Sequence, residues 1–252
     1  MKLKIMTFNI RNSHANDGIN SFKFRKPHIL EVIRKYEPHI IGFQEVTDEI
    51  YDFFCDSIRD KYELIACGRD ADLHGERSAI AYKKDDFAVI KSETFWLSPT
   101  PDVPASTYGA DQSRWPRITT YALMKAYSCG APFIVANTHF DHLGKEARLK
   151  SAKQMCAFFA GSKHPVFFTG DFNAEPSEPT IKTICRDFTD LTADIPPTFH
   201  NYGDREDARI KIDYVFSSVK DIKSTATLVS DGPFDGVYPS DHYPVLVTVD
   251  YN

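Results

Sequence analysis

Apolar residues recur along the chain with two different spacings. Polar segments rich in turn-forming residues separate the apolar segments from one another. Short runs enriched in Val, Ile, Phe and Thr predict strands, whereas longer segments with an apolar residue at every third or fourth position predict helices. Strands are predicted at Lys2–Ile10, His39–Phe43, Ser78–Tyr82, Phe87–Phe95, Ile118–Ala126, Phe133–Thr138, Val166–Thr169, Ile210–Ser217, Thr225–Val229 and Tyr243–Val249. Helices are predicted at Thr47–Arg59, Lys145–Ala160, Glu178–Cys185 and, with proline in its first turn, Pro27–Tyr36.

The two halves of the chain repeat one order of elements. In the first half, a strand with Asn9 near its end is followed by a helix and then by a strand that runs towards Glu45. In the second half, a strand that leads into Asn137–His139 is followed by a helix and then by a strand that runs towards Asp171. This pattern predicts one α/β domain over residues 1–252, in which two similar halves pack sheet against sheet and their strand ends meet at one site.

Leu97–Pro116 is a long segment rich in Pro, Ser and Asp, and it has no strand or helix pattern. Such loops often carry binding residues, so we expect this one to face the substrate.

Composition and charge narrow the function classes. Hydrophobic residues make up 42% of the chain, enough for a sizeable core, and the net charge of −5 argues against tight, non-specific binding to duplex DNA. The five cysteines show no metal-ligand spacing and are expected to be reduced. We recognise neither a signal peptide nor an apolar stretch near the roughly 20 residues of a membrane helix, so we expect a cytoplasmic protein without membrane insertion.

Polar residues lie within or just after the predicted strands along the whole chain. Each of them alone is explained by a turn or a helix cap, but their recurrence at strand ends indicates a shared site. They are Asn9, Glu45, His139, Asp171, Asn173, Asp213, Asp241 and His242.

These residue types suit metal-assisted hydrolysis of a phosphate ester. A hard cation such as Mg²⁺ needs oxygen ligands, which Glu45 and Asp241 could supply, with Asn9 holding Glu45 or a metal-bound water. Asp171 could act as the base that orients and deprotonates the attacking water. Asn173 could stabilise charge at the phosphorus.

Two histidines complete the predicted site. His139 and His242 could donate to the phosphate or to the leaving group, and a carboxylate behind each ring would fix its tautomer and orientation. We expect Glu76 behind His139 and Asp213 behind His242.

Six segments, in this order, resemble the endonuclease/exonuclease/phosphatase superfamily: TFNIR, GFQEV, NTHFDH, GDFNA, KIDYVF and SDHYPV. They extend over nearly the whole chain, and the sequence is most similar to a bacterial branch of the family. The resemblance implies a deoxyribonuclease I-like, four-layered α/β sandwich, in which two mixed β-sheets pack face to face with helices outside. It also implies a phosphoesterase that depends on Mg²⁺ or Mn²⁺.

The resemblance assigns roles to the same strand-end residues, by motif. It implies metal-side positions at Asn9 and Glu45, and it matches Asp213 and the Asp241–His242 pair to the family's two C-terminal motifs. It matches Asp171 and Asn173 to the family's GDFN pair. One branch of the family has a histidine at the position of His139, and Glu76 lies where that branch often has an acidic partner for the histidine.

Other residues are candidates for binding the substrate. Arg77, Arg114 or Arg117 could clamp a phosphate with two hydrogen bonds, and Trp115 could stack on a base or a sugar. Surface ion pairs and ordinary packing explain the same residues equally simply. His142 belongs either to the site or to the surface at the start of the following helix.

We therefore expect a hydrolase of phosphodiesters or phosphomonoesters, whose partner is a small-molecule substrate or a single-stranded nucleic acid. No obligate protein partner is evident from the sequence. An endonuclease or exonuclease acting on single-stranded DNA or RNA is the alternative. A non-catalytic module that binds a phosphorylated ligand or a protein on the same fold would be expected to lack some of these residues, and this chain retains them all.

Overall fold

A computed structural model describes residues 1–109, 111–128, 130–203 and 208–251. Its strands form two six-stranded sheets. Across the first sheet the strands are β11 (Ser224–Leu228), β12 (Val245–Asp250), β1 (Lys2–Asn9), β2 (Ile40–Val46), β4 (Arg77–Lys83) and β3 (Tyr62–Ile65). Across the second they are β5 (Phe87–Trp96), β6 (Ile118–Ala126), β7 (Pro132–His139), β8 (Val166–Asp171), β10 (Asp213–Ser217) and β9 (Thr189–Asp190).

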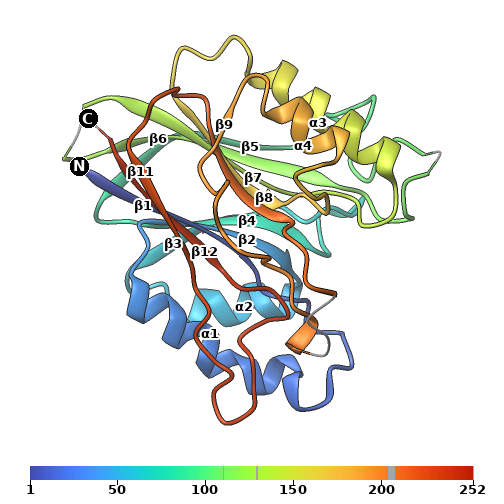
Figure 1. The fold of residues 1–252 in the computed structure, drawn as a ribbon, viewed down its shortest axis with the longest axis vertical. Coiled ribbons are helices and arrows are strands. Elements are labelled where there is room, and N and C mark those ends of the chain that lie inside the picture. Colours follow the sequence, from blue (N-terminus) through green and yellow to red (C-terminus); the bar gives the residue numbers. More distant parts are fainter. Residues whose placement is uncertain (110, 129, 204–207, 252) are drawn as a thin grey trace.

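Helices cover the outer face of each sheet, and Figure 1 shows the resulting four layers. The first sheet carries α1 (Phe22–Tyr36) and α2 (Asp48–Ser57), and the second carries α3 (Lys145–Phe159) and α4 (Pro179–Ile184). Both sheets are mixed, since β1 is parallel to β2 and β7 is parallel to β8 among antiparallel neighbours. The predicted four-layered α/β sandwich is confirmed.

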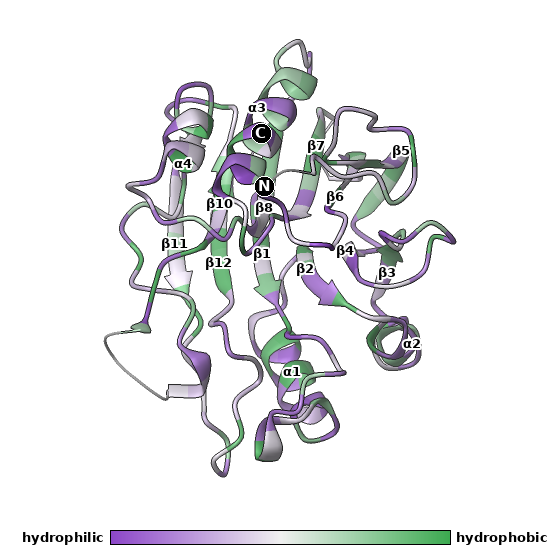
Figure 2. Ribbon diagram, turned by 90° about the vertical axis from the view of Figure 1, so that its right-hand side faces the viewer, coloured by the Kyte–Doolittle hydropathy of each residue, from purple (hydrophilic) through white to green (hydrophobic). Residues whose placement is uncertain are grey.

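The alternation of side chains along the strands explains this layering. On β1, Leu3 and Ile5 pack between the two sheets, whereas Met6 and Phe8 pack against the helices outside. In Figure 2, α1 carries both hydrophobic and hydrophilic colours, as expected of a helix with one face on a sheet. Burial of both strand faces therefore needs a second sheet on one side and helices on the other.

The structure corrects several predicted boundaries. Helix α1 begins at Phe22 rather than at Pro27, because the buried Arg25 fills an inward-facing position that the sequence pattern treats as polar. Strands β3 and β9 were not predicted, since both are too short to show a period. The strand predicted from Ile210 begins only at Asp213.

The cysteines and the helices add little to the functional question. Cys55, Cys67, Cys156 and Cys185 are free thiols, and Cys129 lies outside the described residues. Over the described parts of the chain, no helix has the length and apolar character needed to cross a membrane.

A buried network of polar side chains joins the two sheets beneath the strand ends. The amide of Asn137 donates to the carbonyl oxygens of Phe43 (2.8 Å) and Ala79 (2.9 Å). Its side-chain oxygen accepts from Gln44 (2.7 Å) and Thr169 (3.1 Å). Every hydrogen-bonding group of this side chain is thus paired, which holds the two sheets in one register relative to each other.

Replacing Asn137 by alanine is expected to lower the free energy of unfolding by about 3 kcal/mol, because it leaves several buried polar groups without partners. Denaturant titration measures this loss. The exposed Asn16→Ala is the control and should change stability by less than about 0.5 kcal/mol. A similarly small effect of Asn137→Ala would show that the network does not join the sheets.

Candidate active site

The strand ends of both sheets meet at one cavity of about 350 Å³. The register sets Asp171 between two neighbours, opposite His139 on β7 and opposite Asp213 on β10. Nine of the predicted site residues line this cavity, namely Glu45, Glu76, Trp115, Arg117, His139, Asp171, Asn173, Asp241 and His242. Asn9 and Asp213 lie directly behind lining residues and hydrogen-bond to them.

Asp171 is the most central carboxylate of the site and is only 2% exposed. Its Oδ2 accepts a hydrogen bond from Nδ2 of Asn9 at 2.9 Å. The same oxygen lies 3.6 Å from Nε2 of His139 and 3.8 Å from Nε2 of His242. One carboxylate oxygen is therefore surrounded by an amide and two imidazoles.

The surroundings of Asp171 also adjust its acidity. Burial and the nearby charge of Asp213 raise the pKa of Asp171 to about 7, against the opposing influence of His242. A carboxylate with a pKa near neutrality can accept a proton from water and release it again at physiological pH.

Glu45 reaches the cavity through a local irregularity of its strand. The pairing of β2 with β4 shifts register between Phe43 and Val46, and Glu45 has a positive φ of 62°. Bulges of this kind redirect side chains beside active sites. The Glu45 carboxylate accepts from Nδ2 of Asn9 at 3.0 Å, and from the backbone N–H and the side-chain amide of Asn12 at 2.8 Å each.

Glu45 and Asp241 form an acidic pair suited to a hard divalent cation. Burial opposes ionisation of Glu45, but His139, the Arg11 guanidinium and the N–H groups of Asn12 outweigh it and lower the pKa of Glu45 to about 2. Burial raises the pKa of Asp241, and the charge of Glu45 adds to this although His242 opposes it. A divalent cation bound by the two oxygen donors would relieve their mutual repulsion, so the residues present fit Mg²⁺ or Mn²⁺.

Asn9 connects the acidic pair to the central carboxylate. Its Nδ2 donates to both Glu45 and Asp171, while its side-chain oxygen accepts the backbone N–H of Arg11 at 2.9 Å. Because that oxygen is engaged, Asn9 fits the predicted role of holding Glu45 better than that of a direct metal ligand.

Another set of possible ligand atoms comes from Asp171, Asp213 and His242, which lie within 4.8 Å of one another. Nδ1 of His242 is 2.9 Å from Oδ2 of Asp213, as the sequence led us to expect. Although burial opposes it, the charge and hydrogen bond of Asp213 raise the pKa of His242 to about 10. The imidazole is therefore a cation at neutral pH, which suits it to an anionic substrate rather than to a metal ion.

His139 lacks the carboxylate partner that we expected. The structure pairs Glu76 with Arg69 at 2.6 Å, and among the described residues Glu76 makes no hydrogen bond to His139. The guanidinium offers Glu76 a charged donor, which is a stronger partner than a neutral ring. Burial and the nearby Arg117 lower the pKa of His139 well below its usual value, so its ring is neutral.

Asn173 follows β8 in a left-handed conformation, with φ of 47°. Its backbone N–H donates to Asp171 at 2.9 Å and its side-chain amide donates to the carbonyl oxygen of Phe140 at 3.0 Å. These bonds fix the residue at the rim of the cavity, beside the central carboxylate.

The three candidate arginines lie in different surroundings. Arg117 lines the cavity, whereas Arg114 lies over the ring of Trp115 at 4.3 Å. Arg77 was predicted to bind substrate, but it pairs with Asp48 on α2, lies over a tyrosine ring and does not line this cavity. Arg77 is the first residue of β4, and its pairing with Asp48 holds its side chain towards α2 rather than towards the cavity that Glu76 lines.

We expected the loop Leu97–Pro116 to face the substrate, but among its described residues only Trp115 lines the cavity. Trp115 lines the cavity, but Asp111 accepts the backbone N–H groups of Glu146 (2.7 Å) and Ala147 (3.0 Å). The loop thus caps the N-terminus of α3, where no residue of the helix itself supplies a side-chain cap. These contacts of Asp111 join the loop to the helix rather than to the cavity.

Arg25 is a buried residue that the sequence analysis missed. Its guanidinium donates to carbonyl oxygens of Asn20 (2.7 Å), Arg11 (3.0 Å), Asn12 (3.3 Å) and Pro239 (3.2 Å). It thereby ties the loop that supports Glu45 to the segment that precedes Asp241. The sequence signals this role only by placing a charged residue at a position of α1 that faces inwards.

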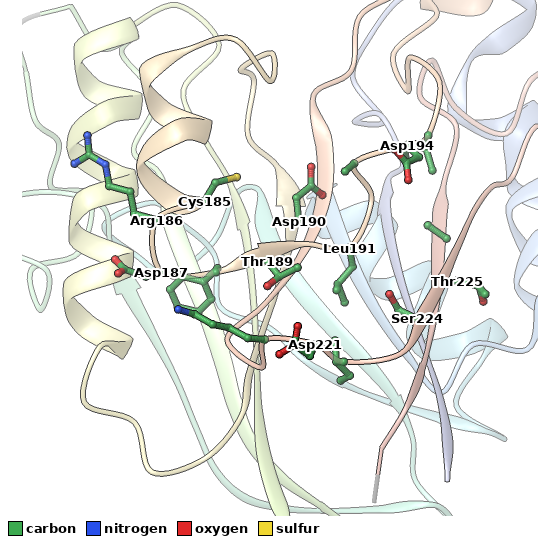
Figure 3. Close-up of a pocket in the computed structure, with 16 residues that line it drawn as sticks. Cys185, Arg186, Asp187, Thr189, Asp190, Leu191, Asp194, Asp221, Ser224 and Thr225 are labelled. Carbon is green, nitrogen blue, oxygen red and sulfur yellow. The ribbon is translucent and has the colours of Figure 1, made fainter.

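A larger cavity, of about 790 Å³, lies elsewhere, between β9 and β11 at the edges of the two sheets (Figure 3). Arg186 and Asp187 lie on one side of it and Ser224 and Thr225 on the other. It contains none of the strand-end residues, so size alone does not identify the site.

Replacing Asp213 by asparagine is expected to lower kcat/KM on a phosphate ester between about tenfold and a hundredfold, because the residue orients His242 and stabilises its charge. NMR titration of the His242 imidazole should show a lower pKa in the variant. The exposed Asp194→Asn serves as the control. Unchanged activity together with an unchanged His242 titration would contradict this role.

Comparisons with known proteins show the family to which the chain belongs. The model of the endonuclease/exonuclease/phosphatase family matches residues 6–242. A search of curated proteins found no match. An endonuclease/exonuclease/phosphatase from Bacteroides vulgatus is 30% identical, with a TM-score of 0.91 and 100% of each chain covered.

Two further solved structures extend the comparison. A mannosyl-6-phosphatase from Bacteroides thetaiotaomicron is 28% identical with a TM-score of 0.86, over 99% of this chain and 100% of that one. The human Nocturnin catalytic domain shares the fold at 21% identity and a TM-score of 0.75, over 100% of this chain and 94% of that one. With a family match over nearly its whole length, the chain belongs to the endonuclease/exonuclease/phosphatase family.

Proposed function

We propose that the protein hydrolyses a small phosphate ester with the aid of Mg²⁺ or Mn²⁺. The observation that carries this proposal is the arrangement of Asp171, with a pKa of about 7, beside the acidic pair of Glu45 and Asp241. A bound divalent cation supplies charge neutralisation at the phosphoryl oxygens and at the leaving oxygen. The carboxylates of Glu45 and Asp241 would hold it.

The side chains of the site share the remaining work. Asp171 takes a proton from the attacking water, and Asn9 keeps that carboxylate oriented through its 2.9 Å hydrogen bond. The cationic His242 donates to a phosphoryl oxygen, where negative charge accumulates. His139, neutral and 3.6 Å from Asp171, is available to donate or accept a hydrogen bond at the same phosphate, and Asn173 binds another oxygen.

The size and charge of the site favour a small substrate. A cavity of about 350 Å³ lies at the low end of the range for small-molecule sites, and the net charge of −5 disfavours a long polyanion. The similarity to a mannosyl-6-phosphatase supports a phosphorylated metabolite as substrate.

A single-stranded nucleic acid is the second candidate. It is favoured by Trp115, which lines the cavity and is 38% exposed, so that its ring could stack on a base. Activity that falls steeply with added salt would indicate this substrate, because binding a phosphate backbone releases counterions.

A screen of phosphate esters tests the proposal. Sugar phosphates, inositol phosphates, nucleotides, p-nitrophenyl phosphate, its bis ester, single-stranded DNA and RNA are incubated with Mg²⁺, with Mn²⁺ or with EDTA. We expect hydrolysis of at least one small ester with metal and none with EDTA. Hydrolysis at equal rates in EDTA, or of no ester at all, would contradict the proposal.

A further inference from the structure

Two buried arginines form one wall of the site cavity. Arg69 is 6% exposed and Arg117 is 4% exposed, and both line the cavity. Within the part of the chain that the structure describes, Nε of Arg69 and Nη1 of Arg117 are buried and have no hydrogen-bond partner. Buried N–H groups of a guanidinium are costly to leave unpaired, so two of them in a cavity wall indicate an acceptor on a bound molecule.

His142 adds a third donor to this wall. Its Nδ1 lies 2.9 Å from Nη2 of Arg117. A guanidinium only donates, so Nδ1 is the acceptor and the ring proton is on Nε2. Burial and the charge of Arg117 lower the pKa of His142, which keeps the ring in this neutral form. Since His142 lines the cavity, its Nε2–H is available to a ligand there.

Both guanidinium groups are held rigidly from behind. Nε of Arg117 is 3.4 Å from Asp141, whose carboxylate also accepts the backbone N–H groups of Leu143 (3.0 Å) and Gly144 (2.7 Å). Asp141 does not line the cavity, so it does not compete with a ligand there.

Arg69 is fixed on three sides. Glu76 binds its guanidinium at 2.6 Å, and the ring of Trp115 lies 4.8 Å from that group. The indole N–H of Trp96 donates to its backbone oxygen at 2.7 Å. A positioned guanidinium loses little entropy when it binds a phosphate through two hydrogen bonds.

We propose that Arg69, Arg117 and His142 bind a second phosphate group of the substrate, so that the preferred substrates are small bisphosphorylated molecules. This rests on the proposed function, in which the first phosphate is hydrolysed beside Glu45, Asp171 and His242. The metal-side carboxylates and His242 serve the phosphate that is hydrolysed, whereas the unpaired guanidinium N–H groups, which belong to the segments that precede β4 and β6, take no part in that reaction. These N–H groups therefore suit a second anionic group of the same ligand.

Titration of inorganic phosphate into the metal-free protein in EDTA tests the subsite without any catalysis. Calorimetry should detect one phosphate bound, and Arg69→Gln and Arg117→Gln should each weaken it about tenfold or more. Glu45→Gln should not weaken it, because removal of a carboxylate from the cavity cannot lower the affinity of the cavity for an anion. The exposed Arg186→Gln, outside this cavity, is the matched control and should bind as the unchanged protein does.

His142→Gln keeps the test decisive if an arginine variant does not fold, because His142 is exposed. It should weaken phosphate binding about threefold to tenfold. Absence of phosphate binding to the metal-free protein would overturn the proposal, as would binding that Glu45→Gln weakens and none of the wall variants does.

A second experiment tests the substrate class. Glucose 1,6-bisphosphate should inhibit the Mg²⁺-dependent hydrolysis of p-nitrophenyl phosphate at a concentration about tenfold or more below that of glucose 6-phosphate. Arg69→Gln should remove this difference. Equal inhibition of the unchanged protein by both compounds would overturn the bisphosphate preference. If p-nitrophenyl phosphate is not hydrolysed, the proposed function loses support, and the phosphate titration alone decides the subsite.

Discussion

Replacing Asp171 by asparagine is expected to lower kcat by about a thousandfold on any phosphate ester that the protein hydrolyses, because the amide cannot take a proton from water. The substitution keeps the size of the side chain, and the neighbouring Asn9 and His139 remain in place. Steady-state kinetics at saturating substrate and metal measure the loss. The exposed Asp187→Asn should leave kcat unchanged.

The same substitution has an expected effect on stability. Folding raises the pKa of Asp171 from an ordinary 3.8 to about 7. Ionisation of Asp171 therefore lowers the free energy of unfolding as pH rises from about 4 to about 7, and the whole loss applies above pH 7. Asp171→Asn removes the cost, and the metal-free variant should therefore melt at a higher temperature than the unchanged protein at pH 8. A folded variant that keeps its activity would contradict the assignment of Asp171 as a base.

Replacing Glu45 by glutamine is expected to raise the Mg²⁺ or Mn²⁺ concentration for half-maximal activity by about a hundredfold or more, because a hard cation loses a charged oxygen ligand. The side-chain oxygen of glutamine can still accept the two hydrogen bonds that Asn12 donates, although its amide nitrogen cannot accept the one from Asn9. The fold should persist, and part of the activity should return at high metal concentration.

The matched control for this substitution is Glu49→Gln, an exposed position on α2 that pairs only with Lys26 among the described residues. It should leave the metal dependence unchanged. If Glu45→Gln lowers activity equally at every metal concentration, Glu45 does not hold the metal and acts on the substrate or on the fold instead.

Much of the fold could be predicted because burial leaves a regular trace in the sequence. The two faces of β1 carry different apolar residues, which predicts a strand covered on both sides. The shortest strands could not be predicted, since β9 has only two residues and no period. The start of α1 was misjudged because burial of Arg25 depends on carbonyl groups that distant parts of the chain provide.

The convergence of the site could also be predicted, since strand ends of packed sheets meet at one edge. The pairings could not, because hydrogen-bond partners depend on distances that sequence order does not encode. Asp213 behind His242 agrees with expectation, whereas Glu76 pairs with Arg69, a residue outside the recognised motifs. Arg77 adjoins Glu76 but pairs with Asp48 on α2, so the order of these two residues in the sequence does not show which of them reaches the cavity.

Several motif residues serve the fold rather than the chemistry. Gln44 and Asn137 belong to the segments GFQEV and NTHFDH, yet both are fully buried beneath the site and hydrogen-bond to each other at 2.7 Å. A motif therefore contains the support of a site as well as the site itself, and only the structure separates the two.

Hydrolysis of the best substrate in water labelled with ¹⁸O tests the central claim most directly. If Asp171 directs water at the phosphorus in a metal-dependent reaction, mass spectrometry should find one labelled oxygen in the phosphate product and none in the alcohol. The label should enter only when Mg²⁺ or Mn²⁺ is present. Label in the alcohol, or equal incorporation with EDTA, would contradict the account.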